Sequence, residues 1–168
     1  MADDKYKILY EYQKAQFDDE NNRFSKIEDK ATKLLTALSF FIPLFILIST
    51  KIFERIDSFN CLFYWTITFI ITLILFSASS AWWAILRSIC LMDSKRMPTK
   101  KIREELFNKN SLDTCYVELS ELYSDMVGVY RRLNADKNEF IGLAYNEILF
   151  AAGFFLLLVI LTFVLLVI

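Results

Sequence analysis

Histidine is absent from this chain of 168 residues, and glycine, proline and cysteine are scarce. Without histidine the chain lacks the commonest general base near neutral pH and a usual partner of a catalytic or zinc-binding cysteine. Cys61, Cys90 and Cys115 are scattered and form no C-x-x-C pair, so we expect them to be reduced and either structural or incidental. These absences argue against an enzyme, a metal site or a cofactor.

An excess of either charge is also missing. Lysine and arginine number 19 and acidic residues 20, which gives a net charge of −1. Residues 1–33 hold seven cations and eight acids, and residues 87–147 hold ten of each. Nothing in this balance indicates nucleic-acid binding through bulk charge.

What the chain does contain is three long apolar stretches, residues 34–50, 59–86 and 148–168. A helix needs about 20 residues, with about 17 as the lower limit, to cross a bilayer. The first stretch has 17 residues and contains Pro43, which predicts a kink. It follows more than thirty residues rich in charge, so we do not expect a signal peptide. None of the stretches indicates a proton relay or voltage sensor, since charged side chains are lacking.

The pattern predicts an all-α membrane protein with three transmembrane helices and long cytoplasmic helical extensions that form a helical bundle. We expect the following segments: a cytoplasmic amphipathic helix at 1–33, transmembrane helices at 34–50, 59–92 (with its extension) and 148–168, a short external loop at 51–58, and a cytoplasmic helical stalk at 93–147. Lysine and arginine favour the cytoplasmic side. Only two lie in residues 51–60, so the N-terminus is expected to be cytoplasmic.

Heptad spacing indicates that the two cytoplasmic segments pack together. In the first, the repeating residues are Tyr10, Phe17, Phe24 and Ala31. In the second, Ser111 is expected to cap a helix that follows a short helix at 100–108 and a turn at 108–111. Two heptad rows are predicted on this helix: Leu112, Leu119, Met126, Leu133 and Phe140, and Tyr116, Tyr123, Tyr130, Lys137 and Ala144.

Several polar residues have both a functional and a structural interpretation. Tyr116, Tyr123 and Tyr130 with Arg131 and Arg132 would suit a nucleotide, by stacking a base and holding a phosphate. Tyrosines at this spacing more often fill a helical seam, and we favour that interpretation.

Two further sets lie in or beside the membrane stretches. Thr68, Thr72 and Ser79 share one face of the second stretch, and Ser77 with Ala81 forms a small-xxx-small pair, so this face is expected to line a pore or to pack helices. Lys100, Lys101 and Arg103 are expected to meet lipid headgroups. Adjacent acids, namely Asp18, Asp19 and Glu20, and Glu104 and Glu105, are expected to be solvated.

One resemblance covers nearly the whole chain. The run Asp29-Lys30-Ala31-Thr32-Lys33-Leu34-Leu35, with Phe17, Asn22 and Phe24 upstream, resembles the membrane entry of small bacterial effectors, the Pycsar transmembrane effectors and related antiphage proteins. The order of the later elements is also similar: Pro98 after the second stretch, then Asn134-Ala135-Asp136-Lys137, then Tyr145 and a last apolar span.

The resemblance implies a membrane-disrupting effector that stays inactive until phage infection and then arrests or kills the cell. A nucleotide second messenger would be one trigger. Since no separate cyclic-nucleotide-binding domain is evident, a partner protein such as a nucleotidyltransferase or a retron-type complex is equally open. The main alternative is a passive adaptor that recruits a soluble partner to the inner membrane. A lipid-modifying enzyme built on Asp93, Ser94 and Glu147 is a weaker third hypothesis.

The sequence also predicts how copies of the chain would assemble and which charges would lie near the membrane surface. Three helices cannot enclose a water-filled path, so permeabilisation would require a homo-oligomer in the bilayer. Asp29 and Lys30 precede the first membrane stretch, and Asp136 and Lys137 lie below the third. We expect these four charges to pair across the bundle near the membrane surface.

Overall fold

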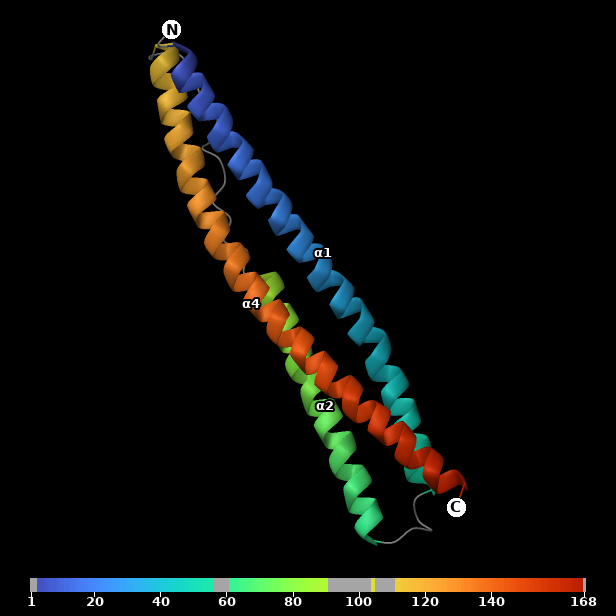
Figure 1. Cartoon of the computed structure of the whole chain (residues 1–168). Coiled ribbons are helices and arrows are strands. Elements are labelled where there is room, and N and C mark those ends of the chain that lie inside the picture. Colours follow the sequence, from blue (N-terminus) through green and yellow to red (C-terminus); the bar gives the residue numbers. More distant parts are fainter. Residues whose placement is uncertain (1–2, 56–60, 91–103, 105–110, 168) are drawn as a thin grey trace. The chain divides into compact units, whose positions relative to one another are not determined.

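The computed structural model describes residues 3–55, 61–90, 104 and 111–167. These residues form three long helices: α1 (Asp3–Arg55), α2 (Cys61–Cys90) and α4 (Leu112–Val167) (Figure 1). No strand occurs in the part of the chain that is described, so the all-α prediction is confirmed there. Each helix contains a stretch long and apolar enough to cross a membrane. Apart from residues 104 and 111, the expected short helix at 100–108 and its turn at 108–111 lie outside the described residues, as do Lys100, Lys101 and Arg103 with their expected lipid contacts.

The ends of the helices follow local sequence signals. Ser111 caps α4, because its carbonyl accepts a bond from the Cys115 N–H (3.1 Å) and its hydroxyl lies 3.4 Å from the Thr114 nitrogen. The helix α1 passes through Pro43 and continues to Arg55, so residues 51–55, expected in a loop, are helical. An ion pair one turn apart, Lys51 to Glu54 at 2.7 Å, supports this last turn.

The chain forms two compact units, and α1 and α4 contribute to both. The first, here called the helix pair, consists of residues 3–29 of α1 and 111–137 of α4 among those described. The second, the three-helix bundle, consists of residues 30–55 of α1, all of α2 and residues 138–167 of α4. Because α1 and α4 are unbroken, each carries the same heptad repeat from one unit into the next.

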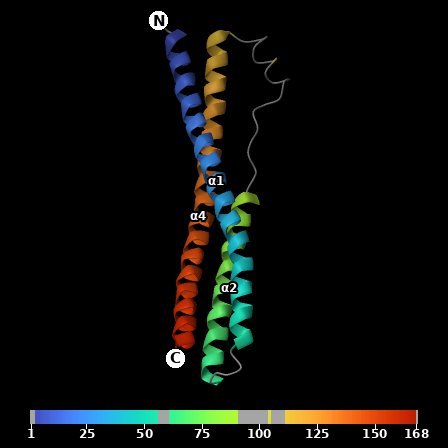
Figure 2. The same cartoon turned by 90° about the vertical axis from the view of Figure 1, so that its right-hand side faces the viewer.

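The helix pair is parallel, since residues early in α1 contact residues early in its half of α4 (Figure 2). The row Tyr116, Tyr123, Tyr130 and Lys137 lies at the contact, as predicted. The second predicted row is confirmed in part: Met126 is buried and Leu119, Leu133 and Phe140 are half-buried, whereas Leu112 is 67% exposed. A further buried row, Ser120, Val127 and Asn134, lies one residue further along. Serine and asparagine in that row hide it from a search for apolar repeats.

The three-helix bundle has a small apolar core of Phe45 from α1, four isoleucines of α2, and Ala151 and Leu158 of α4. In α2 the buried isoleucines are Ile67, Ile70, Ile71 and Ile74. Here α2 runs antiparallel to the other two helices, because Tyr64 meets Phe53 and Arg87 meets Phe140. Ser77 and Ala81 are buried in this packing, so their small side chains serve helix contact within the chain.

Large apolar side chains are also exposed on the outside of the three-helix bundle. Phe40, Leu62 and Phe76 are each more than three-quarters exposed. A surface of this kind is costly in water and suits a lipid environment. Exposed Trp65 near one end of α2, and Trp82 and Trp83 near the other, lie about 26 Å apart along the helix at 1.5 Å per residue. That spacing matches the two aromatic belts of a bilayer.

Candidate functional site

The most specific feature of the helix pair is a ladder of alternating aromatic rings. Rings of Tyr10 and Phe17 from α1 insert between the tyrosines of α4: Tyr10 lies 5.6 Å from Tyr116 and 5.7 Å from Tyr123, and Phe17 lies 5.5 Å from Tyr123 and 5.3 Å from Tyr130. These centroid distances and tilted or edge-to-face angles are the favourable ones for aromatic pairs. The ladder therefore aligns α1 and α4 in one register.

Phe24 extends the ladder by one further step. Its ring lies 5.7 Å from that of Tyr130 and carries the Lys137 ammonium 4.0 Å from its centroid. Because each of these tyrosines lies between two rings of α1, Tyr130 is only 9% exposed and Tyr123 only 8% exposed. Their rings are covered by α1, which favours the packing interpretation of the tyrosine stripe over base stacking.

The two arginines of that predicted site have different environments. Both are exposed, but Arg131 bonds Glu20 of α1 at 3.1 Å. A phosphate would therefore compete with Glu20 for Arg131. The predicted cluster is thus divided between a covered aromatic seam, one engaged arginine and one solvated arginine.

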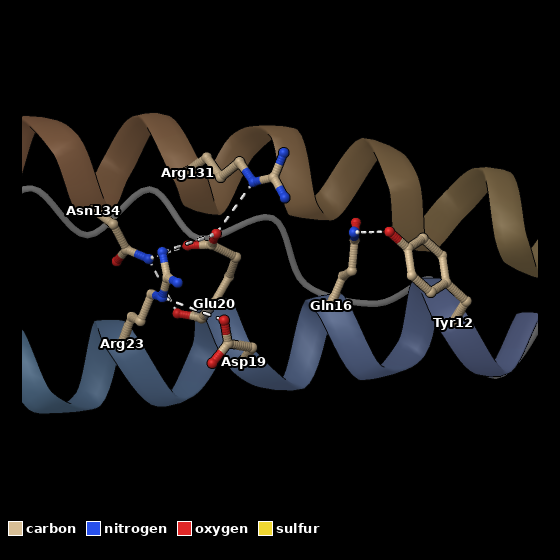
Figure 3. A network of polar contacts seen from close by, with 7 residues as sticks. All are labelled: Tyr12, Gln16, Asp19, Glu20, Arg23, Arg131 and Asn134. Atoms are coloured by element: carbon tan, nitrogen blue, oxygen red, sulfur yellow. Dashed lines mark hydrogen bonds and ion pairs between the residues drawn. The ribbon is translucent and has the colours of Figure 1, made fainter.

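Glu20 is the centre of a polar network that the sequence did not reveal (Figure 3). It is 5% exposed, so the expectation that it is solvated like its neighbours Asp18 and Asp19 is wrong. Its carboxylate accepts bonds from Arg131 and from the Asn134 amide (2.9 Å), and it lies 3.7 Å from the Arg23 guanidinium. A buried carboxylate needs such partners because desolvation alone would disfavour its charge.

Asn134 joins the two helices through both parts of Glu20. Its side-chain nitrogen donates to the Glu20 carboxylate and, at 3.0 Å, to the Glu20 backbone carbonyl. Its side-chain oxygen is buried and finds no hydrogen-bond partner among the described residues. An asparagine in a helical seam fixes the register of the two helices, because its amide is bonded in one alignment only. It does so at some cost in stability, because its buried oxygen has no hydrogen-bond partner among the described residues.

Lys137 is the most buried charged residue of the helix pair, with 0% of its surface exposed. Its ammonium bonds Glu28 at 2.9 Å and stacks on Phe24. The expected pairing with Asp29 is therefore corrected to Glu28, one residue earlier on α1. Asp29, Lys30 and Asp136 have exposed side chains. The prediction located the acidic partner of Lys137 to within one residue along α1. Because successive residues of a helix are rotated by 100°, it is the Glu28 side chain and not that of Asp29 that points toward α4.

Burial also affects the chemistry of Tyr123. Desolvation raises the pKa of its phenol above 10.0, and neighbouring Tyr10 and the charge of Asp18 raise it further. The tyrosine is therefore neutral at physiological pH and acts as a packing residue with a hydroxyl at the seam.

The polar residues of α2 divide between two faces. The hydroxyls of Thr68, Thr72 and Ser79 bond carbonyls four residues earlier in their own helix, and none of the three lies in the buried face of α2. Their side chains can therefore contact another copy of the chain or lipid. Ser77, in contrast, donates to Glu147 of α4, at 2.6 Å to its carboxylate and 2.8 Å to its carbonyl.

Comparisons with models of protein families, with curated proteins and with solved structures find no match for this chain. The three cysteines form no disulfide, and only Cys115 is buried.

Proposed function

We propose that this protein is a membrane-disrupting effector of a bacterial antiphage defence system, and that the closed helix pair is its inactive state. The observation that carries the proposal is the continuity of α1 and α4, which run unbroken from the polar helix pair into the apolar three-helix bundle. A change in the pairing of these helices would be passed directly to the segments in the membrane.

The composition of the helix pair supports such a change. Its seam contains buried Glu20, Asn134 and Lys137 beside the aromatic ladder. Opening the seam returns these groups to water, which offsets part of the lost aromatic packing. A seam of this kind is a suitable two-state element, closed by default and opened by a trigger.

The trigger is proposed to be a nucleotide second messenger or a partner protein, such as a nucleotidyltransferase or retron-type complex. The bacterial inner membrane, with the N-terminus cytoplasmic, is the proposed location, since cations are concentrated in residues 1–33 and 87–147. Several copies would assemble to permeabilise the membrane, and the free face of Thr68, Thr72 and Ser79 is the proposed contact or pore lining.

The experiment is to follow membrane potential with a voltage-sensitive dye in bacteria that express the chain, first alone and then with a candidate trigger system under phage challenge. Depolarisation on induction or on challenge would support a gated effector. An intact potential in both conditions, with the protein confirmed in the membrane, would favour the adaptor, which should leave cells healthy when overproduced.

A further inference from the structure

A groove opens between α1 and α4 in the three-helix bundle, just before their apolar stretches begin. It has a volume of about 460 Å³, and its floor and walls include Leu34, Ile141 and Tyr145. Lys30 and Lys33 stand at its edge. No residue of α2 and no acidic residue is among the described residues that line it.

Gly142 of α4 lines this groove without a side chain of its own. A Cβ placed there would meet no atom within 4 Å, so any larger side chain would project into free space. α4 meets α2 through other residues, namely Phe140 with Arg87 and Glu147 with Ser77. The groove is thus on the side of the α1–α4 contact that α2 does not cover.

Charge and position identify the chemistry of an occupant. Neither Lys30 nor Lys33 forms an ion pair within the described parts of the chain, and both are exposed. Lys33 directly precedes the apolar residues 34–50, at the depth where lipid phosphates lie if α1 crosses a bilayer. Two cations above an apolar groove match an anionic headgroup above an acyl chain.

We propose that this groove binds one anionic phospholipid, with its phosphate between Lys30 and Lys33 and an acyl chain along Leu34, Ile141 and Tyr145. The lipid would fill the contact between α1 and α4 where the apolar stretches begin. The inference holds for an effector and for an adaptor alike, because it requires only that the three-helix bundle lies in a membrane.

Native mass spectrometry of the full chain in detergent tests this binding, with phosphatidylglycerol and phosphatidylcholine of matched chains present in equal amounts. The wild type is expected to retain phosphatidylglycerol preferentially. Lys30→Gln with Lys33→Gln should reduce that preference about 25-fold, since each lysine near a lipid surface contributes about fivefold. Lys14→Gln with Lys26→Gln, which removes two exposed lysines elsewhere on α1, is the matched control and should retain it.

Two variants test the apolar part of the groove. Gly142→Leu should fill it, and Tyr145→Ala, at a residue 54% exposed, should remove one wall without risk to the fold. Both are expected to retain less of either lipid at unchanged helix content by circular dichroism. Any of three results would overturn the proposal. The wild type could retain the two lipids equally, the control variant could lose as much preference as the Lys30 and Lys33 variant, or both groove variants could retain phosphatidylglycerol in full.

Discussion

Lys137 shows how a single residue can determine the energetics of the helix pair. It is fully buried, yet its ammonium is matched by Glu28 and by the face of Phe24. Such a group stabilises only while its partners are present, because a buried charge without them is costly. Because both partners of Lys137 are on α1, any separation of α1 from α4 would remove these contacts and destabilise the seam further.

Lys137→Ala is therefore expected to destabilise the helix pair by about 3 kcal/mol, because it empties the seam and leaves Glu28 and Phe24 without their cation. Lys137→Met, which keeps most of the volume without a charge, should cost less than half as much. Hydrogen exchange of the amides around Phe24 in the full chain measures the effect, with exposed Lys26→Ala as the control. Equal exchange in Lys137→Ala and Lys26→Ala would contradict the role assigned to Lys137.

Tyr123 makes the helix pair sensitive to alkali. Its pKa is raised above 10.0 by burial, so the unfolded chain ionises first as pH rises. The stability contributed by the neutral phenol is complete below about pH 10 and is lost as pH rises through the raised pKa. The melting temperature by circular dichroism should fall above pH 10 in the wild type, and fall less in Tyr123→Phe. An identical alkaline profile in both proteins would show that Tyr123 does not titrate in this way.

At the scale of the element, the ladder predicts energetic coupling between α1 and α4. Phe17 and Tyr130 lie 5.3 Å apart with nearly perpendicular rings. A double-mutant cycle of Phe17→Leu and Tyr130→Leu should give a coupling energy of about 1 kcal/mol. The same cycle with exposed Tyr6 in place of Phe17 should give none, and coupling of equal size there would mean that the ladder has no specific energy.

The sequence predicted the aromatic heptad row in each helix of the pair, and Met126 of the second row predicted for α4 is also buried. It did not predict the burial of Glu20 on α1 or the row that contains Ser120 and Asn134 on α4, since these residues are polar and their burial depends on partners from the other helix. Apolar periodicity detects burial by hydrophobicity alone, and a polar pair that is satisfied across a seam leaves no such signal. The aromatic row was recognisable for the opposite reason, as Tyr123 and Phe17 bury apolar surface.

The ends of elements were less predictable than their centres. Lys51 and Glu54 were expected in a loop because they are charged, but their ion pair continues the helix. The Ser77–Glu147 bond joins residues 70 apart in the chain, and no local pattern predicts it. Thr68, Thr72 and Ser79 were recognised as one face, although the chain alone does not assign that face a partner.

At the scale of the whole molecule, the proposed role rests on α1 and α4 being shared between the helix pair and the three-helix bundle. If closure of the helix pair keeps the membrane segments inactive, weakening the seam should activate the protein without any trigger. Removing two rings of the ladder, with Phe17→Ala and Tyr130→Ala together, is the sharpest such change, because both residues belong to the helix pair and neither to the three-helix bundle. Removing exposed Tyr6 and Tyr12 deletes as many rings from the helix pair outside the ladder.

Membrane potential in uninfected bacteria that express these two double variants at matched levels is the most direct measurement. We predict that Phe17→Ala with Tyr130→Ala depolarises the cells and that Tyr6→Ala with Tyr12→Ala leaves the potential as in the wild type. An unchanged potential with the ladder variant, confirmed in the membrane and helical, would contradict control of the membrane segments by the helix pair.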